Sequence, residues 1–269
     1  MDDNFSDIGT GQNELTDEDK LKLANIDTEW KNFTLGMNEA KDVLRKCQQD
    51  FKATMEEQLD EFKREVTENR EKFKIQAPFM VNKEFEAENN KKAFDVIQQF
   101  QIECKNLRDR EEDMQFGLDI FDIDAQKYHD LAMVEKENAS LLTIWQIKQE
   151  YDGAWNAWKQ IHFTELEFRE MEDNATEINF KLNDLSKDER KWKASEHTYD
   201  TIQNFLNTVP LLQALRDESM RDRHWKELRI EVKEDFDEHG QDFTLEKVYS
   251  LNLLQHQDKI EEICSHARQ

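Results

Sequence analysis

The sequence is poor in the two residues that make tight turns. Its 269 residues include only 6 glycines and 2 prolines, while 36% are Asp, Glu, Lys or Arg. A compact α/β enzyme of this length needs many tight turns, which draw on Gly and Pro. Their scarcity, beside abundant helix formers, predicts an all-α protein: an elongated array of long helices and helical bundles, with coiled-coil-like packing in the N-terminal part.

Cysteine, positive charge and long apolar runs are also scarce. Cys47, Cys104 and Cys264 lie far apart without metal-ligand spacing, which is typical of reduced thiols in a cytoplasmic protein. With 61 acidic residues against 37 Lys and Arg, the net charge of −24 disfavours binding to nucleic acid, anionic membranes or the acidic microtubule surface. No apolar run approaches the ~20 residues that span a bilayer. Residues 1–16, acidic and polar, are predicted to be a disordered lead-in rather than a signal peptide.

Sequence motifs for common catalytic chemistry are missing. The chain contains no GxxxxGK[ST] phosphate loop, no GxSxG nucleophile elbow and no HExxH zinc motif. Pairs of acidic residues are frequent, but so many acids are expected to produce such pairs on any solvated helix face. We therefore predict no enzymatic activity and no cofactor or metal for this chain.

Apolar residues in the first third of the chain follow a heptad pattern. From Ile26 to Phe51 their spacing alternates between four and three residues, which is typical of a coiled-coil seam. The four-residue step from Phe51 to Met55 is a stutter, which locally unwinds a supercoil. We interpret residues 17–123 as a segment of long helices.

Helix boundaries within that segment can be placed from local signals. Thr16, followed by three acidic residues, predicts a helix start, and Pro78 predicts the stop, so one helix is expected over 17–74. A second is expected over 82–115. The apolar stretch 116–126 breaks the periodicity and is predicted to form a turn packed on a neighbouring helix.

Residues 124–209 are predicted to form an aromatic-rich helical bundle. A helix over 125–160 carries an unusually aromatic face, and aromatic residues at helical spacing are usually core rather than a ligand box. Two capping boxes predict the next helix starts, and Pro210 predicts a helix end followed by four shorter helices near 211–216, 219–233, 245–251 and 258–267. The capping boxes pair Thr164 with Glu167, beside a Phe163–Phe168 hydrophobic staple, and Ser186 with Glu189; the predicted aromatic core is Trp145, Tyr151, Trp155, Trp158 and Trp192.

The stretch "MRDRHWKEL", residues 220–228, is the most distinctive in the chain. On a helix, Arg221, Trp225 and Leu228 share one face, and His224 adjoins them. Trp225 and Leu228 can be buried beneath the stem of Arg221, whose guanidinium would cap neighbouring helix ends or pair with an acid. The stretch is therefore an anchor between helices, a docking surface for a negative partner or an active site, and its geometry favours the anchor.

From about Glu18 to the C-terminus, and most strongly from Phe205 onward, the chain resembles dynein heavy chains where the stem passes into the linker. A proline-led P-L-x-x-x-L element is followed by an arginine and an R-H-W signature, and "F-T-L" and "I-x-E-I-x-x-x-A" elements come later. In this sequence these elements are Pro210, Leu211, Leu215, Arg216, Met220, Arg221, Arg223, His224 and Trp225, then Phe243 to Leu245 and Ile260 to Ala267.

The resemblance implies a mechanical role. The chain would be a non-catalytic stem and linker segment of the axonemal type, with residues 210–269 at the start of the linker, either part of a longer heavy chain or a short paralogue. It would transmit ATP-driven motion of the motor ring to the tail in the cytoskeleton of a cilium or flagellum. Its partners would be that ring and other dynein heavy, intermediate or light chains. The alternative interpretation is a free-standing coiled-coil or spectrin-like scaffold or tethering protein that uses the heptad seam.

Overall fold

The computed structural model describes residues 16–120, 124 and 126–268. Within these ranges the chain forms eight α-helices and three short 3₁₀ turns, with no β-strand beyond one isolated bridge between His162 and Thr244. The all-α prediction is therefore confirmed. A search of the described helices finds none whose length and apolarity would suit a membrane span.

The helices divide between two compact units, and α1 and α2 each contribute to both. Of the described residues, the first unit comprises 16–62, 114–120 and 124, and the second comprises 63–113 and 126–268. The helices are α1 (Asp17–Gln76), α2 (Lys83–Ile120), α3 (His129–Trp158), α4 (Phe168–Asn183), α5 (Lys193–Leu215), α6 (Asp222–Val232), α7 (Leu245–Ser250) and α8 (Gln257–Arg268), with 3₁₀ turns at Phe163–Glu165, Glu189–Lys191 and Leu253–His256.

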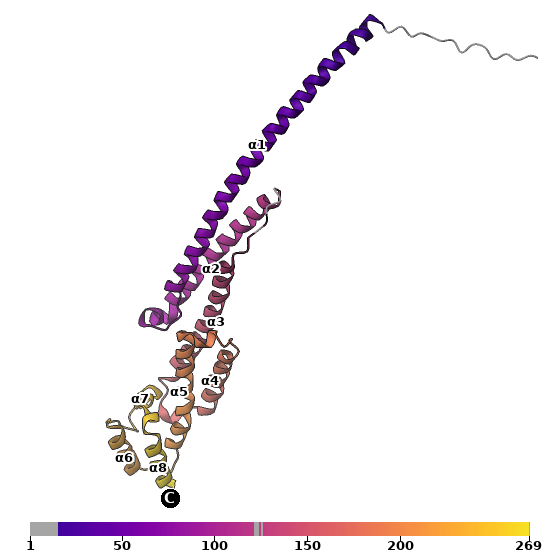
Figure 1. Cartoon of the computed structure of the whole chain (residues 1–269). Helices are drawn as coiled ribbons and strands as arrows, with labels where there is room; N and C mark the ends of the chain where they lie inside the picture. The colour runs from indigo at the N-terminus through magenta and orange to yellow at the C-terminus, as the bar shows by residue number, and fades with distance from the viewer. Residues whose placement is uncertain (1–15, 121–123, 125, 269) are drawn as a thin grey trace, which may run out of the picture. The chain divides into compact units, whose positions relative to one another are not determined.

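Helix α1 begins and ends where the sequence predicts, within two residues. Its start is a reciprocal cap: the backbone N–H of Asp19 donates to the Thr16 hydroxyl, and the backbone N–H of Thr16 donates to the Asp19 carboxylate, each at 3.2 Å. It stops at Gln76, just before Pro78. Figure 1 shows α1 as one uninterrupted helix.

In the first unit, α1 packs on the end of α2. Met55, Leu59 and Leu118 are buried together. The predicted turn at 116–126 is wrong over its first five residues, because α2 continues through Gly117 to Ile120. A Cβ on Gly117 would lie 3.3 Å from the Met55 side chain, so the glycine allows close helix packing here and does not break the helix. Residues 121–123 and 125 lie outside the described part.

Before Met55, the apolar stripe of α1 is exposed. Trp30 and Leu44 retain 67% and 62% of their accessible surface. The predicted seam therefore exists as a stripe, and its side chains from Leu23 to Leu44 are exposed. The exposed members are Leu23, Ile26, Trp30, Phe33, Met37 and Leu44.

Helix α2 contains a left-handed turn that its periodicity does not predict. Ala87 is extended, and Glu88, Asn89 and Asn90 have φ of 51°, 61° and 66°. Residues with a Cβ avoid this region because the Cβ crowds the following carbonyl oxygen, although Asn tolerates it better than most. Tertiary contacts of Asn90, described below, hold the turn in place.

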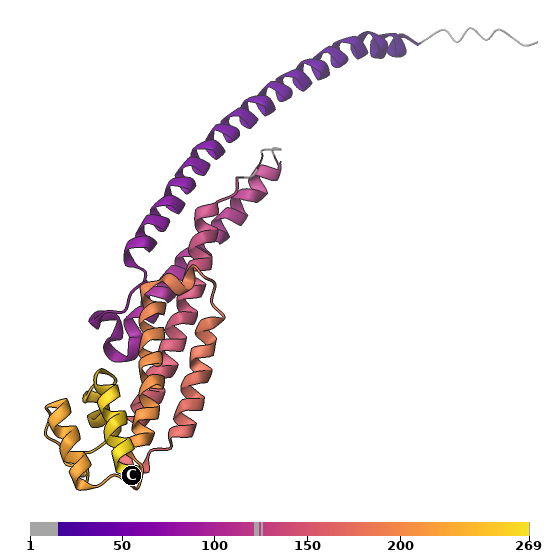
Figure 2. The same cartoon turned by 60° about the horizontal axis from the view of Figure 1, so that its bottom comes forward.

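In the second unit, α3, α4 and α5 lie side by side, while α6 and α8 pack near the C-terminal end of α5 (Figure 1 and Figure 2). One hydrophobic core runs through these helices. It includes Phe205 and Leu212 of α5, Ile178 of α4, Leu228 of α6 and Ile260 of α8, each at most 1% exposed.

Pro210 lies inside α5, so the predicted helix end there is wrong. Its neighbours Val209, Leu211 and Leu212 are all buried in the core. Proline inside a helix costs about 3 kcal/mol because it removes a hydrogen bond and crowds the preceding turn. Burying several apolar side chains at ~1.5–3 kcal/mol each outweighs that cost. The predicted helix near 211–216 is consequently the end of α5, and the three later helices are found where predicted.

Replacing Pro210 with alanine should stabilise the protein. Pro210 is exposed, so the change leaves the core intact and restores a donor for the carbonyl of Leu206. We expect the free energy of unfolding to rise by about 1–3 kcal/mol, measured by urea denaturation. The control is Gln213→Ala, an exposed position further along α5, which should shift stability by only a few tenths of a kcal/mol. A loss of stability in Pro210→Ala would contradict the prediction.

The two predicted capping boxes have different outcomes. Ser186 and Glu189 form theirs: the Ser186 backbone N–H donates to Glu189 at 2.8 Å, and the Glu189 N–H donates to the Ser186 hydroxyl at 3.4 Å. This capping box lies at the start of the 3₁₀ turn Glu189–Lys191, just before α5. The box at Thr164 and Glu167 is wrong, because α4 begins at Phe168 without a side-chain cap.

Tertiary pairing explains the missing box. The backbone N–H of Phe163 donates to the Phe243 carbonyl at 2.9 Å, which holds this segment against the turn before α7. The predicted staple pair still meets, with the rings of Phe163 and Phe168 6.2 Å apart.

Candidate functional site: the junction after α5

Trp225 is packed among aromatic rings from separate segments. Its indole is 8% exposed and makes edge-on contacts with Phe163, Phe236 and Phe243, at centroid distances of 6.3, 6.2 and 5.9 Å. Such pairs add about 0.5–1.5 kcal/mol each beyond area burial. Together with Leu228, which is fully buried, Trp225 places α6 in the same core as α5.

His224 fixes the start of α6. It is 2% exposed, and its Nδ1 accepts the backbone N–H of Arg221 at 3.1 Å, while the His224 backbone N–H donates to the Arg221 carbonyl at 2.8 Å. The side chain of Arg223 lies on the other ring nitrogen, with Nε 2.9 Å from Nε2. His224 is therefore a structural cap buried within the chain.

Arg221 does not play the expected role. It is the exposed residue before α6, in extended conformation, and it contributes backbone contacts. Arg216 fills that role instead: it lies 4.3 Å over the Phe168 ring and donates to the carbonyl of Leu166. This arginine links the end of α5 to the start of α4, as a cation that satisfies backbone carbonyls should.

A second arginine, which the sequence does not single out, contacts Phe236, one of the rings packed against the indole. Arg229 lies 5.3 Å over the Phe236 ring, donates to the Phe236 carbonyl at 2.9 Å and pairs with Glu238. The signal is absent from the sequence because Phe236 and Glu238 follow α6 in an irregular segment whose course cannot be read from periodicity.

The predicted aromatic core divides into two places. Tyr151 is buried in the main core, with Trp155 and Trp158 half-buried against it; Trp158 stacks on Phe205 at 5.4 Å. Trp145 and Trp192 instead contact the connection between α1 and α2. Trp145, fully buried, donates its indole N–H to the Pro78 carbonyl at 2.8 Å. Trp192 packs edge-on against Phe79 at 5.0 Å.

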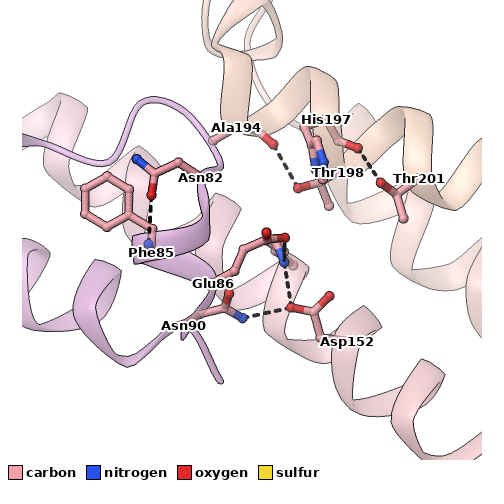
Figure 3. Close-up of polar contacts among 10 residues, drawn as sticks. Asn82, Phe85, Glu86, Asn90, Asp152, Ala194, His197, Thr198 and Thr201 are labelled. Atoms are coloured by element: carbon pink, nitrogen blue, oxygen red, sulfur yellow. Dashed lines mark hydrogen bonds and ion pairs between the residues drawn. The ribbon is translucent and has the colours of Figure 1, made fainter. Parts of the chain in front are cut away.

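Polar contacts of Asp152 tie the left-handed turn of α2 to α3 (Figure 3). Asp152 accepts from Lys148 Nζ at 2.7 Å and from the Asn90 side-chain amide at 2.8 Å, through the same oxygen. Glu86 lies 3.3 Å from Lys148 Nζ, and the lysine side chain is only 7% exposed. A buried ammonium needs such partners because desolvation is costly.

Two bidentate ion pairs link α3 to α1 and α2. Arg70 of α1 donates to both carboxylate oxygens of Glu137 at 2.7 and 2.8 Å, and Arg108 of α2 does the same to Glu135 at 2.9 and 2.7 Å. These hydrogen bonds raise the pKa of both guanidinium groups. The planar fork of arginine makes such pairs geometrically specific.

Asp217 closes the turn between α5 and α6. Ser219 donates its hydroxyl to Asp217 Oδ1 at 2.7 Å and its backbone N–H at 3.0 Å, and Arg268 donates to Oδ2 at 3.0 Å. These bonds, those from Ser219 first, lower the pKa of Asp217 to about 2. The carboxylate thus links the turn to the end of α8.

These three hydrogen bonds to Asp217 predict that stability depends on pH. Because the pKa of Asp217 is depressed on folding, its contribution to stability is complete above its ordinary pKa of 3.8 and is lost as the pH falls towards 2. An NMR titration of the carboxyl carbon should give a midpoint near 2. Ser219→Ala should raise this midpoint more than Arg268→Ala does. A midpoint near 3.8 in the unchanged protein would contradict the structure.

Among the described residues, one group could offer three metal ligands. Ligand atoms of Asp222, Glu238 and His239 lie within 4.8 Å of one another. Glu238, however, is already paired with Arg229, so its charge is neutralised by the protein itself. Buried aromatic rings, caps and ion pairs suit this region to holding helices together.

Comparison with known proteins identifies the class. A family model described as dynein heavy chain, N-terminal region 2, matches residues 131–269, which run from α3 to the end of α8. The chain belongs to the dynein heavy chain family. The match includes both α5 and the Trp225 junction, and it does not favour the free-standing scaffold interpretation.

The relatives are axonemal dynein heavy chains. Dynein axonemal heavy chain 2 of Mus musculus is 32% identical over 247 residues, which cover 91% of this chain and 5% of the relative. The dynein-1-beta heavy chain of the flagellar inner arm I1 complex of Chlamydomonas reinhardtii is 31% identical over 251 residues, 93% of this chain and 6% of the relative. The chain thus spans about a twentieth of the length of these relatives.

Proposed function

We propose that the chain is a non-catalytic stem and linker segment of an axonemal dynein heavy chain, with residues 210–269 at the start of the linker. It acts as a mechanical arm that carries ATP-driven motion of a motor ring to the tail. Its partners are that ring and other dynein heavy, intermediate or light chains, and its place is the cytoskeleton of a cilium or flagellum. The net charge of −24 supports contacts with proteins rather than with the acidic microtubule surface.

One observation carries the proposal. Helix α5 crosses from the aromatic bundle into residues 210–215 without a break, and it buries Phe205 on one side of Pro210 and Leu212 and Leu215 on the other. A helix shared by two segments transmits displacement as a rigid body, because packed cores resist gradual deformation. The Trp225 cluster and Arg216 then fix α6 and the start of α4 to the end of that helix.

The proposal can be tested in a complete heavy chain that carries this segment. Leu228→Asp should loosen the junction without touching an ATPase module. We expect ATP turnover to stay within about twofold while microtubule gliding velocity falls severalfold, because hydrolysis no longer moves the tail. The control is Ile230→Asp, on an exposed position of the same helix, which should leave both unchanged. Unchanged gliding in Leu228→Asp, with the junction shown to be loosened by proteolysis, would overturn the proposal.

A further inference from the structure

A cavity of about 530 Å³ lies between the end of α4 and the first turns of α5. Its volume falls within the range of about 300–1,000 Å³ that is usual for small-ligand sites. Leu182 of α4 and Ser195 of α5, which are 1% and 2% exposed, are the buried residues of its wall. The remaining lining residues all carry polar groups, so the cavity offers several hydrogen-bonding and charged groups to a ligand.

Ser195 is a buried polar residue in this wall that lacks a partner. Among the residues that the structure describes, none bonds its hydroxyl and none accepts its backbone N–H. The adjacent N–H groups of Ala194 and Glu196 each donate to a carbonyl, at 2.8 and 2.9 Å, and α5 has no side-chain cap. Buried polar groups almost always have a hydrogen-bond partner. The free donors of Ser195 therefore indicate that the cavity receives a ligand with an acceptor atom.

The end of the cavity at Ser195 is positively charged. Arg190, in the connection that precedes α5, lines the cavity, and its guanidinium pairs with no carboxylate in the described part of the chain. The free N–H groups in the first turn of α5 add the positive end of the helix dipole. A helix N-terminus together with an arginine binds oxyanions, and the Ser195 hydroxyl adds a further donor. This end of the cavity is suited to a carboxylate.

The part of the cavity further along α5 is suited to a cation. Asp200 lines it, and its carboxylate is paired with no described lysine or arginine. Tyr199, whose side chain is 42% exposed, lines the same part, and an aromatic ring beside a carboxylate favours an ammonium group. The other carboxylate of the lining, that of Glu196, is already paired with Lys193 at 2.8 Å. Asp200 is therefore the free negative charge of the cavity.

The spacing of these groups limits the kind of ligand. Ser195 and Tyr199 are four residues apart, so they lie on one side of α5. At 1.5 Å per residue, Asp200 lies about 7.5 Å along the helix from Ser195. An anion alone would meet Asp200 without a compensating charge, and a cation alone would meet Arg190 in the same way. A ligand that suits both ends carries an anion and a cation joined by a chain of about this length.

We propose that this cavity binds a zwitterion whose carboxylate and ammonium are joined by an unbranched apolar chain, which is the chemistry of lysine with a free α-carboxylate. The carboxylate lies at Arg190 and Ser195, and the ammonium lies at Tyr199 and Asp200. Leu182 gives the wall an apolar side chain for the chain between them. Free lysine and the C-terminal lysine of a polypeptide share this chemistry. The inference goes beyond the proposed function and does not rest on it.

Isothermal titration calorimetry of the full 269-residue chain with 6-aminohexanoate tests the site, because this compound has the two charges and the apolar chain without other groups. We expect saturable binding at one site with a Kd below about 1 mM. Hexanoate and hexylamine each lack one of the charges and should bind about tenfold more weakly. A chain that binds none of the three compounds, or binds all three equally, would overturn the proposal.

Substitutions at the two ends of the cavity test the orientation of the ligand. Arg190→Gln and Asp200→Asn should each weaken the binding of 6-aminohexanoate about tenfold, and Arg190→Gln should leave the weak binding of hexylamine unchanged or stronger. Both residues are exposed, so the fold should be retained, which circular dichroism checks. Lys187→Gln and Asp173→Asn, at exposed positions outside the cavity, are the matched controls and should bind like the wild type. Binding that survives both Arg190→Gln and Asp200→Asn would refute the site.

A peptide distinguishes the two sources of the ligand. The peptide Ala-Ala-Ala-Lys has an amide where free lysine has its α-ammonium group, and both carry the α-carboxylate and the side-chain ammonium. Tighter binding of the peptide would identify the end of a polypeptide as the ligand, and tighter binding of lysine would identify the free amino acid; either result supports the site. The same peptide with an amidated C-terminus lacks the carboxylate and should not bind. If it binds as tightly as the unmodified peptide, the proposal is wrong.

Discussion

Replacing Trp225 with alanine should lower the free energy of unfolding by about 3–5 kcal/mol, the usual range for removing a buried tryptophan. The indole is 8% exposed and touches three phenylalanine rings contributed by segments far apart in sequence. Its removal leaves a cavity that these rings cannot fill without moving away from α6. Urea denaturation followed by circular dichroism measures the change.

The matched control for this variant lies on the same helix. Ile230 is 77% exposed, so Ile230→Ala should alter stability by less than about 0.5 kcal/mol. If Trp225→Ala unfolds at the same urea concentration as the wild type, the tryptophan does not anchor the junction. The anchor interpretation would then have to be abandoned in favour of a docking surface.

Replacing Asp152 with alanine should cost about 2–4 kcal/mol, because it leaves the buried ammonium of Lys148 and the amide of Asn90 without their shared acceptor. Glu86, 3.3 Å from Lys148, compensates only in part, so we place the loss near the lower end of the range for broken buried pairs. Chemical denaturation measures it.

A second substitution separates charge burial from packing. Lys148→Met in the Asp152→Ala background removes the ammonium that has lost its partner. This change should recover more than half of the lost stability, because an apolar side chain of similar length needs no polar partner. Glu150→Ala is the control: Glu150 pairs with Lys181 at the surface and should cost less than about 1 kcal/mol. If Lys148→Met further destabilises Asp152→Ala, the explanation by an unpaired charge is wrong.

The helical framework could be predicted because its signals are local. Thr16 and Pro78 mark the ends of α1 through their own side chains, and the apolar periodicity determines the helices between them. The same reasoning fails where distant contacts decide. Pro210 remains within α5 because its neighbours are buried, and the left-handed turn at Glu88 persists because Asn90 reaches Asp152 across to α3.

For the junction, the sequence indicated the buried residues better than their polar partners. Trp225 and Leu228 are buried as expected from helical spacing, and the adjoining His224 is buried as well. The contacts of the arginine side chains could not be predicted. Arg216 and Arg229 donate hydrogen bonds to backbone carbonyls of irregular segments, whose positions depend on the whole fold. Periodicity shows which side of a helix is apolar, but it does not show which irregular segment will pack against that helix.

The two arginine–glutamate forks on α3 give the helices a single register. If α3 slid by one helical turn, about 5.4 Å, Arg70 would face Met133 or Leu141 in place of Glu137, and Arg108 would face Leu131 or Ala139 in place of Glu135. A shift in either direction brings no carboxylate opposite the two arginines. A displaced α3 therefore has no alternative register in which these ion pairs form. Under tension these helices should hold their alignment until they separate altogether, and stretching should therefore end in one abrupt rupture without gradual creep.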